Sequence, residues 1–149
     1  MKPNPYLKFM LMLGISFLVM YSVMFLNVAS LAHIHLSLTR TYMTLLMIAP
    51  MALMMVIMIG HMYPNKQRNM AIIITSLGVF VLALVGLRAQ VPIGDAQYMR
   101  AMIPHHSSAI LTSREADLMD PEVRKLANDI IDAQEREIAQ MEAILSRMN

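Results

Sequence analysis

Cysteine and tryptophan are absent from the 149-residue chain, and no acidic residue precedes Asp95. Without cysteine the chain can form no disulfide, no thiolate zinc site and no thiolate nucleophile. Without tryptophan it has no belt of indole rings, so Tyr6, Tyr42 and Tyr63, each near the end of an apolar run, are expected to mark the membrane–water boundary. Any soft-metal chemistry must therefore use methionine, with 18 copies, and histidine, with five.

Charge is scarce and unevenly divided. Hydrophobic residues make up 57% of the chain and charged residues 15%, which is unlike an ordinary soluble domain. Six basic and no acidic residues precede Asp95, whereas six basic and ten acidic residues follow from there, so the formal charges are +6 and −4. The overall +2 describes neither part and gives no sign of a nucleic-acid partner. Membrane lipid is the expected partner of the first part.

Three apolar runs predict transmembrane helices over residues 9–32, 41–63 and 70–87, because about 20 residues cross a bilayer as a helix. Pro50 lies inside the second run and predicts a kink. The first run has a competing interpretation as a secretory signal peptide, with a weak cleavage site at residues 30–32. Its length favours a retained span, since the apolar region of a signal peptide has about 7–15 residues.

Basic residues near the ends of the runs predict the orientation. Four lie on one side and two on the other: Lys2, Lys8, Lys66 and Arg68 against Arg40 and Arg88. The positive-inside rule places the N-terminus in the cytoplasm. The predicted organisation is a membrane domain over residues 1–90 and a periplasmic or extracellular domain over residues 91–149.

The second domain is predicted to be a helical hairpin, which makes the fold class all-α. Asp95 is the expected N-cap of a helix ending near Met119, and Asp120 caps a second helix over residues 121–147. Two helices offer too little surface to cover each other's apolar stripes. The hairpin is therefore expected to pair with a second copy as a four-helix bundle or to pack against the membrane spans.

Four candidate metal ligands fall within eight residues: Met99, Met102, His105 and His106. Helical spacing of i, i+3 and i+7 places Met99, Met102 and His106 on one face. His105 joins them only through a kink at Pro104, a second copy or another partner. The alternative is that Pro104 begins a shorter helix. Thioether and imidazole together favour Cu(I), with Ag(I) as a chemical mimic and Cu(II) or zinc as further candidates.

The last predicted helix carries Gln134, Glu137 and Met141 at the same spacing. Met141 is a fifth candidate ligand. Glu137, supported by Gln134, is expected to accept a hydrogen bond from an imidazole and to fix its tautomer.

The pattern of these residues speaks against two kinds of catalysis. A di-iron carboxylate site needs Glu-x-x-His motifs, and Met102 and Ile103 stand where those glutamates would be. No glycine-rich turn or oxyanion donor accompanies the nearby serines, which argues against hydrolysis. Binding is therefore expected rather than catalysis, and the chain is not predicted to be an enzyme.

Six methionines form a stripe along the second run: Met43, Met47, Met51, Met54, Met58 and Met62. One interpretation is a thioether path for Cu(I), with His61 at one end and His33 and His35 at the other. The favoured interpretation is adaptable packing against the other spans.

From about Asp95 to Met148 the chain resembles the bacterial "domain of unknown function 305" family, a ferritin-like helical group. The matching residues are Met99, Met102-Ile103-Pro104-His105-His106, Ala109-Ile110, Pro121-Glu122, Leu126-Ala127, Ile130-Ile131, Gln134, Glu137-Ile138 and Met141. The family often has glutamine after the histidine pair, whereas Ser107 and Ser108 stand here, which would alter the hydrogen bonds around the site.

Some members of that family resemble periplasmic copper binders linked to copper tolerance. The resemblance therefore implies periplasmic copper binding. Together with the predicted spans, which lie outside the resembling segment, it leads us to expect a protein of the bacterial inner (plasma) membrane whose outer domain binds copper for sequestration, tolerance or hand-over. One alternative is a membrane-anchored helical interaction or oligomerisation module without metal. Another is a subunit of a metal transporter that uses the methionine stripe.

Overall fold

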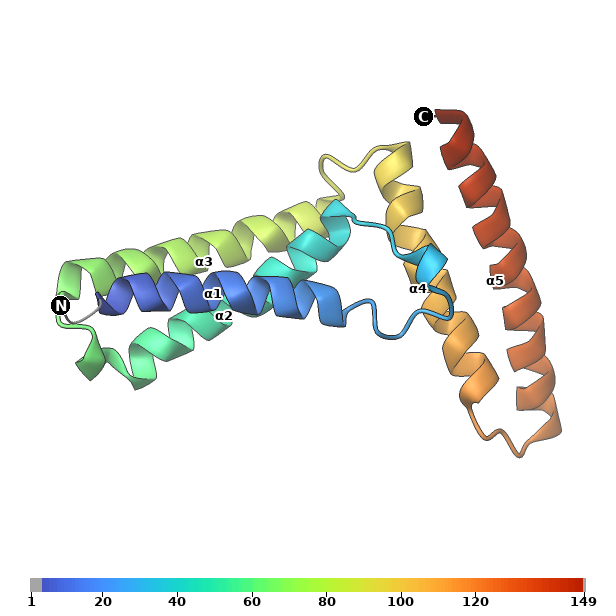
Figure 1. Cartoon of the computed structure of the whole chain (residues 1–149), viewed down its shortest axis with the longest axis horizontal. Coiled ribbons are helices and arrows are strands. Elements are labelled where there is room, and N and C mark those ends of the chain that lie inside the picture. The colour runs from blue at the N-terminus through green and yellow to red at the C-terminus, as the bar shows by residue number, and fades with distance from the viewer. Residues whose placement is uncertain (1–3, 149) are drawn as a thin grey trace. The chain divides into compact units, whose positions relative to one another are not determined.

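The computed structural model describes residues 4–148, and every regular element in that range is a helix (Figure 1). The five α-helices are α1 (Pro5–Val23), α2 (Leu38–Met58), α3 (Lys66–Ala89), α4 (Asp95–Glu115) and α5 (Pro121–Met148). Two short 3-10 helices, η1 (Leu31–His33) and η2 (Gly60–Met62), lie in the connections. The all-α prediction is confirmed for the described residues.

The chain divides into two compact units. The first, here called the membrane unit, comprises the described residues up to Val23 together with residues 39–92 and contains α1, most of α2, and α3. The second, here called the hairpin unit, combines residues 24–38 with the chain from Ile93 onward. The boundary expected at residue 90 lies close to the observed one between Pro92 and Ile93, but residues 24–38 also belong to the hairpin unit.

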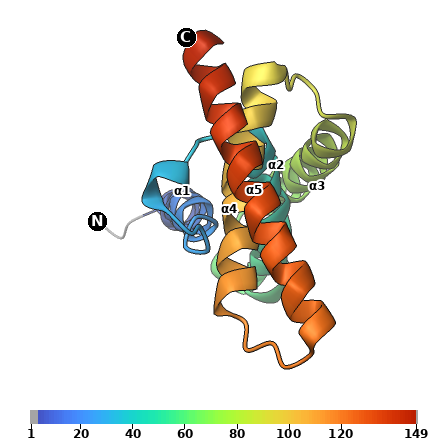
Figure 2. The ribbon, with the colours of Figure 1, turned by 90° about the vertical axis from the view of Figure 1, so that its right-hand side faces the viewer.

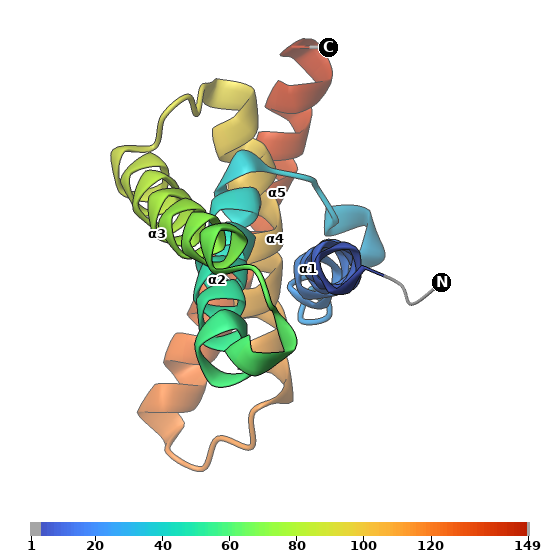
Figure 3. The ribbon, with the colours of Figure 1, turned by 90° about the vertical axis from the view of Figure 1, so that its left-hand side faces the viewer.

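The three helices of the membrane unit are long and apolar enough to cross a bilayer (Figure 3). They have 19, 21 and 24 residues, and their most apolar windows have mean hydropathies of 1.7, 2.0 and 2.6. Leu18 of α1 and Leu82 of α3 are among many large apolar side chains exposed on their surfaces. Such faces are stable where hydrocarbon replaces water.

The helix boundaries depart from the apolar runs. The first run was expected to stay helical to Ala32, but α1 ends at Val23. Beyond it the Ala29 N–H donates to the Ser107 hydroxyl at 2.8 Å instead of to a helical carbonyl. The helix expected over residues 41–63 ends at Met58, and the third begins at Lys66 rather than residue 70 because the Asn65 side chain caps it.

An apolar cluster that includes the aromatic rings of Phe9 and Tyr63 lies at one end of the membrane unit. Phe9, Ala52, Val56 and Tyr63 are its buried members. The Tyr6 hydroxyl lies 2.9 Å from Asn69 Oδ1 and accepts from the Asn65 N–H at 3.0 Å. The start of α1 is thereby tied to the connection between α2 and α3.

Within the hairpin unit, α4 and α5 pack against each other along their length (Figure 2). Their buried core consists of Met99, Ile103, Ile110, Ile138 and Leu145. Asp120 caps α5 as predicted, because its Oδ1 accepts from the N–H groups of Glu122 and Val123.

The start of α4 corrects two expectations. The N-cap is Gly94, and Asp95 is the first helical residue. The Asp95 carboxylate still lies near the positive end of the helix dipole. The helix runs continuously through Pro104 to Glu115, so a shorter helix beginning at Pro104 is wrong, as is an end near Met119.

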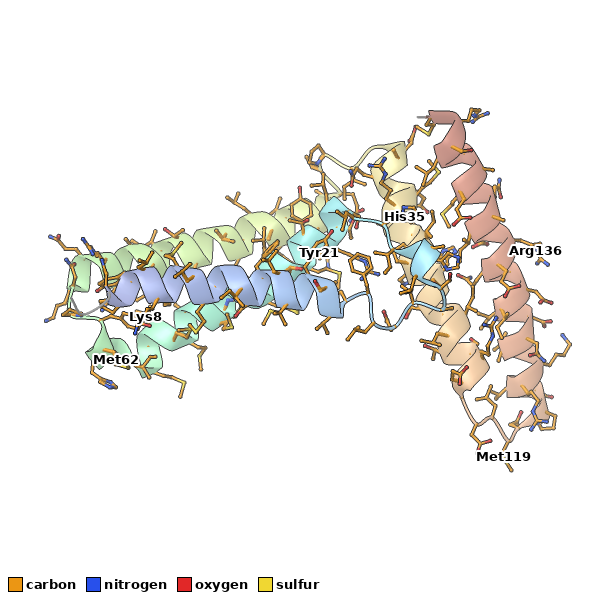
Figure 4. The ribbon with its side chains drawn as sticks, in the orientation of Figure 1. Lys8, Tyr21, His35, Met62, Met119 and Arg136 are labelled. Carbon is orange, nitrogen blue, oxygen red and sulfur yellow. The ribbon has the colours of Figure 1, made fainter. Side chains whose placement is uncertain are left out.

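Most of the methionine stripe is exposed in the membrane unit. Met43, Met47, Met54, Met58 and Met62 are all exposed, and only Met51 is half-buried. Figure 4 shows Met62 projecting from the end of the membrane unit. Most of these thioethers are therefore exposed at the surface of the membrane unit, and their packing against the other spans stays a prediction.

Candidate metal centre

His106 is the predicted ligand whose surroundings are best defined. Its side chain is only 12% exposed, and its Nδ1 lies 3.1 Å from Oε2 of Glu137 on α5. The two atoms are close enough for a hydrogen bond, but their alignment is not that of one, so Nδ1 is buried without a partner. The Glu137 side chain is 53% exposed, so a rotation of its carboxylate would align it with Nδ1.

The protonation of His106 suits a metal ligand. Burial lowers the pKa of His106, the Glu137 carboxylate partly opposes this, and neighbouring His105 adds to the lowering. The imidazole is therefore neutral at physiological pH. With Nδ1 facing a carboxylate, Nε2 is the nitrogen left to bind an ion, which is the usual pairing around metal-bound histidine.

Two thioethers lie at the same interface between α4 and α5. Met99 of α4 is a buried core residue, and Met141 of α5 packs against the cluster to which Met99 belongs. Pairing of α4 with α5 thus brings His106 beside Glu137 and places Met99 and Met141 in one apolar cluster. The predicted residues Met102 and Gln134 are half-buried.

His105 is not drawn into this interface. It is exposed, and its ring centroid lies 5.9 Å from that of His106. The continuous course of α4 through Pro104 leaves the two imidazoles on different sides of the helix, as ideal spacing requires.

Among residues 4–148, no three histidine, aspartate or glutamate side chains gather closely enough to hold an ion. A carboxylate-rich site is thus not assembled in this part of the chain. The predicted ligands on α4 and α5 are instead thioethers and imidazoles, which suit a soft ion.

A third component of the hairpin unit is the loop over residues 24–38, which the sequence did not place there. Four hydrogen bonds involving side chains hold it on α4. The fully buried Ser107 hydroxyl accepts from the Ala29 N–H and lies 2.8 Å from His33 Nδ1. Asn27 donates to Ser108 at 2.7 Å, and the Leu38 N–H donates to Gln97 Oε1 at 3.1 Å.

The loop brings a second pair of imidazoles to the hairpin. His35, labelled in Figure 4 between η1 and α2, has a buried Nε2 without a partner. Burial lowers the pKa of His35; Glu142 opposes this, whereas Arg100 and His33 add to the lowering. The signal that could have revealed the docking was the serine pair at 107 and 108, where the resembling family often has glutamine.

A cavity of about 350 Å³ opens beside His33. Ser30 of the loop, Arg114 of α4, and Glu135 and Glu142 of α5 also line it. Arg114 donates to Glu135 at 3.1 Å, so that carboxylate is already engaged.

Two comparisons with known proteins found a match, one to the C-terminal part of the chain and one to most of its length. A model of the family described as "Domain of unknown function (DUF305)" matches residues 82–148, which include the end of α3 and nearly all of the hairpin. Uncharacterized protein L153 of Acanthamoeba polyphaga mimivirus is 37% identical over 140 residues, covering 91% of this chain and 90% of that protein, so the similarity includes the membrane unit. No solved structure matches. The chain belongs to the domain of unknown function 305 family, whose defining domain forms its C-terminal part.

Proposed function

We propose that this protein is a membrane-anchored copper binder whose hairpin unit lies outside the cytoplasm. The ligands are Met99, Met102, His106 and Met141, with His105 available from the exposed side of α4. The ion is Cu(I), with Ag(I) as a chemical mimic; Cu(II) and zinc are weaker candidates. Binding serves sequestration, tolerance or hand-over, and no catalytic step is proposed.

The observation that carries this proposal is the contact between His106 and Glu137. It spans the α4–α5 interface and leaves a mostly buried neutral imidazole with a carboxylate behind it. A buried imidazole nitrogen without a hydrogen-bond partner is costly unless something else engages the ring. In the proposed site a metal ion binds Nε2, and a rotation of the exposed Glu137 carboxylate lets it accept the Nδ1 proton, so that both nitrogens are engaged.

The orientation rests on the basic residues of the membrane unit. Lys8, Lys66 and Arg68 lie at one end of the spans and Arg40 and Arg88 at the other, while Lys2 precedes the described residues. The positive-inside rule then puts the hairpin unit in the periplasm or outside the cell. Because the similar protein L153 is viral, the proposal specifies the side of a plasma membrane rather than a bacterial cell.

We also propose that two hairpins pair as a four-helix bundle. Val123 and Leu126 project from α5, and Leu126 is 59% exposed. Figure 4 shows Met119 extending from the turn between α4 and α5. Burying such a surface contributes about 25 cal/mol for each Å² removed from water.

The proposal is tested by metal analysis of the full chain purified in lipid nanodiscs and equilibrated anaerobically with Cu(I). The wild-type protein is expected to retain copper through gel filtration, and a His105→Ala/His106→Ala variant to lose most of the copper held by the hairpin. His61→Ala is the matched control because His61 is exposed in η2 of the membrane unit. An unchanged copper content in the paired variant would refute the proposal.

The interaction-module alternative predicts a different result in the same samples. Neither protein would retain copper, and the mass of the assembly would be unaltered by the histidine substitutions. Recording the assembly mass beside the copper content therefore separates the two functions.

The outward-facing methionine stripe favours one second candidate, a transport role. If the stripe conducts Cu(I), replacing Met47, Met51, Met54 and Met58 with leucine should abolish copper uptake into proteoliposomes, because leucine keeps the apolar volume but has no sulfur. A leucine substitution of Met10, Met12 and Met20 in α1 is the control. Equal uptake by the wild-type, stripe and control proteins would assign the stripe to lipid or protein packing.

A further inference from the structure

From His33 to Ser37 the polar side chains are more buried than the apolar ones. His33, His35 and Ser37 point inward and are half-buried or buried, whereas Ile34 and Leu36 are exposed. The alternation follows from the extended backbone at Ile34, with φ −79° and ψ 104°, because side chains two residues apart in an extended segment share a face. Burying two imidazoles while exposing two aliphatic side chains is unfavourable for packing alone.

Ser107 sets the orientation of His33. Its hydroxyl already accepts from the Ala29 N–H, and it has both a proton and a second lone pair left for His33 Nδ1. The contact therefore suits either tautomer of the ring. In both cases Nδ1 is occupied, and Nε2 is the nitrogen that remains for another partner.

His35 presents a second free nitrogen. Its Nε2 is buried and has no hydrogen-bond partner. Glu142, Arg100 and His33 are the charged or titratable groups close enough to act on it. These differ from Glu137 and His105, the groups that act on His106, so the two imidazoles have different charged neighbours.

We propose that the Nε2 atoms of His33 and His35 hold a second Cu(I) ion between the 24–38 loop and the α4–α5 hairpin. This inference rests on the proposed function for the choice of ion. It adds a nitrogen-only site, contributed by the first loop, to the methionine–histidine site of the hairpin.

The charge and number of ligands favour a monovalent soft ion. Cu(I) is stable with two neutral nitrogen ligands, whereas structural zinc takes four protein ligands, and three histidine or carboxylate side chains do not gather anywhere in residues 4–148. Glu142 supplies one compensating negative charge and Arg100 one positive charge nearby. Because these two charges oppose each other, the choice of Cu(I) rests on the small number of neutral nitrogen ligands rather than on local charge.

The test uses the full chain in lipid nanodiscs, loaded anaerobically with Cu(I) and examined by copper content and copper X-ray absorption. The wild-type protein is expected to hold two ions per chain, one with sulfur ligands and one with nitrogen alone. His35→Gln should remove one ion and the nitrogen-only signal. It leaves the contact between His33 and Ser107 in place, so the loop stays docked.

The matched variants make the two sites separable. Met102→Leu/His106→Ala should lose the sulfur-containing signal and keep the nitrogen-only one, and His61→Ala should lose neither. If His35→Gln and His33→Ala/His35→Ala both bind as much copper as the wild type, with an unchanged spectrum, the second site does not exist. Loss of the sulfur-containing signal in Met102→Leu/His106→Ala would still uphold the proposed function in that event.

Discussion

Replacing Glu137 with glutamine is expected to lower the affinity of the full-length protein for Cu(I) by about 10- to 100-fold, the usual cost of removing a carboxylate behind a metal-bound histidine. Glutamine keeps the size of the side chain but carries no charge. The negative charge 3.1 Å from His106 Nδ1 would be gone. The His106 ring would then donate electrons to the metal ion less strongly and would turn away from it more freely. Competition with a colorimetric Cu(I) chelator measures the change.

Glu135→Gln is the matched control for this experiment. Glu135 lies on the same helix with a similar exposure, but its carboxylate pairs with Arg114 at 3.1 Å rather than with a histidine. Its replacement should leave the affinity within a factor of two or three, since exposed ion pairs contribute little. Equal affinities for both variants and the wild type would show that Glu137 does not support the ligand.

Much of the hairpin could be predicted from local signals in the sequence. The stripe of α5 places Ile138, Met141 and Leu145 toward α4 because side chains three and four residues apart share a helix face. Asp120 before Pro121 predicted the start of α5 to the residue. The same spacing argument separated His105 from His106, and the structure places only His106 beside α5.

The placement of the first loop could not be predicted in the same way. The Ser107 hydroxyl meets the Ala29 N–H across 78 positions of sequence. No periodicity links residues so far apart, and the apolar character of residues 24–32 favoured a longer α1. The buried Ser107 hydroxyl on α4 gives the backbone of the loop a partner that water would otherwise have supplied.

What surrounds the methionine stripe could not be predicted for a related reason. Its period indicated a face of α2, and the helix does present those thioethers on one side. Periodicity identifies a face but not what covers it. In α2 the buried positions are Thr44, Ile48, Ala49, Ala52 and Val56, and all of them except Ile48 are smaller than methionine, which allows close approach of neighbouring helices.

Replacing Ser107 with alanine is expected to release the 24–38 loop from α4. The fully buried hydroxyl is the acceptor for the Ala29 N–H and the partner of His33 Nδ1. Removing it leaves that N–H without a partner at a cost of about 1–3 kcal/mol. The Ala29 amide should then exchange with solvent deuterium roughly 5- to 150-fold faster, the ratio that this free energy implies. Hydrogen-exchange mass spectrometry of the full chain in nanodiscs measures it.

Ser108→Ala provides the comparison within the same turn of α4. Ser108 receives only the side-chain amide of Asn27, in an exposed bond, so its loss should change the Ala29 exchange rate little. An Ala29 amide that exchanges equally in both variants would mean that Ser107 does not hold the loop. If Ser107→Ala does free the loop, His33 and His35 leave the hairpin together, whereas His106 keeps its contact with Glu137. The nitrogen-only copper should then be lost before the sulfur-bound copper, which makes the docking of the first loop a requirement for one site and not for the other.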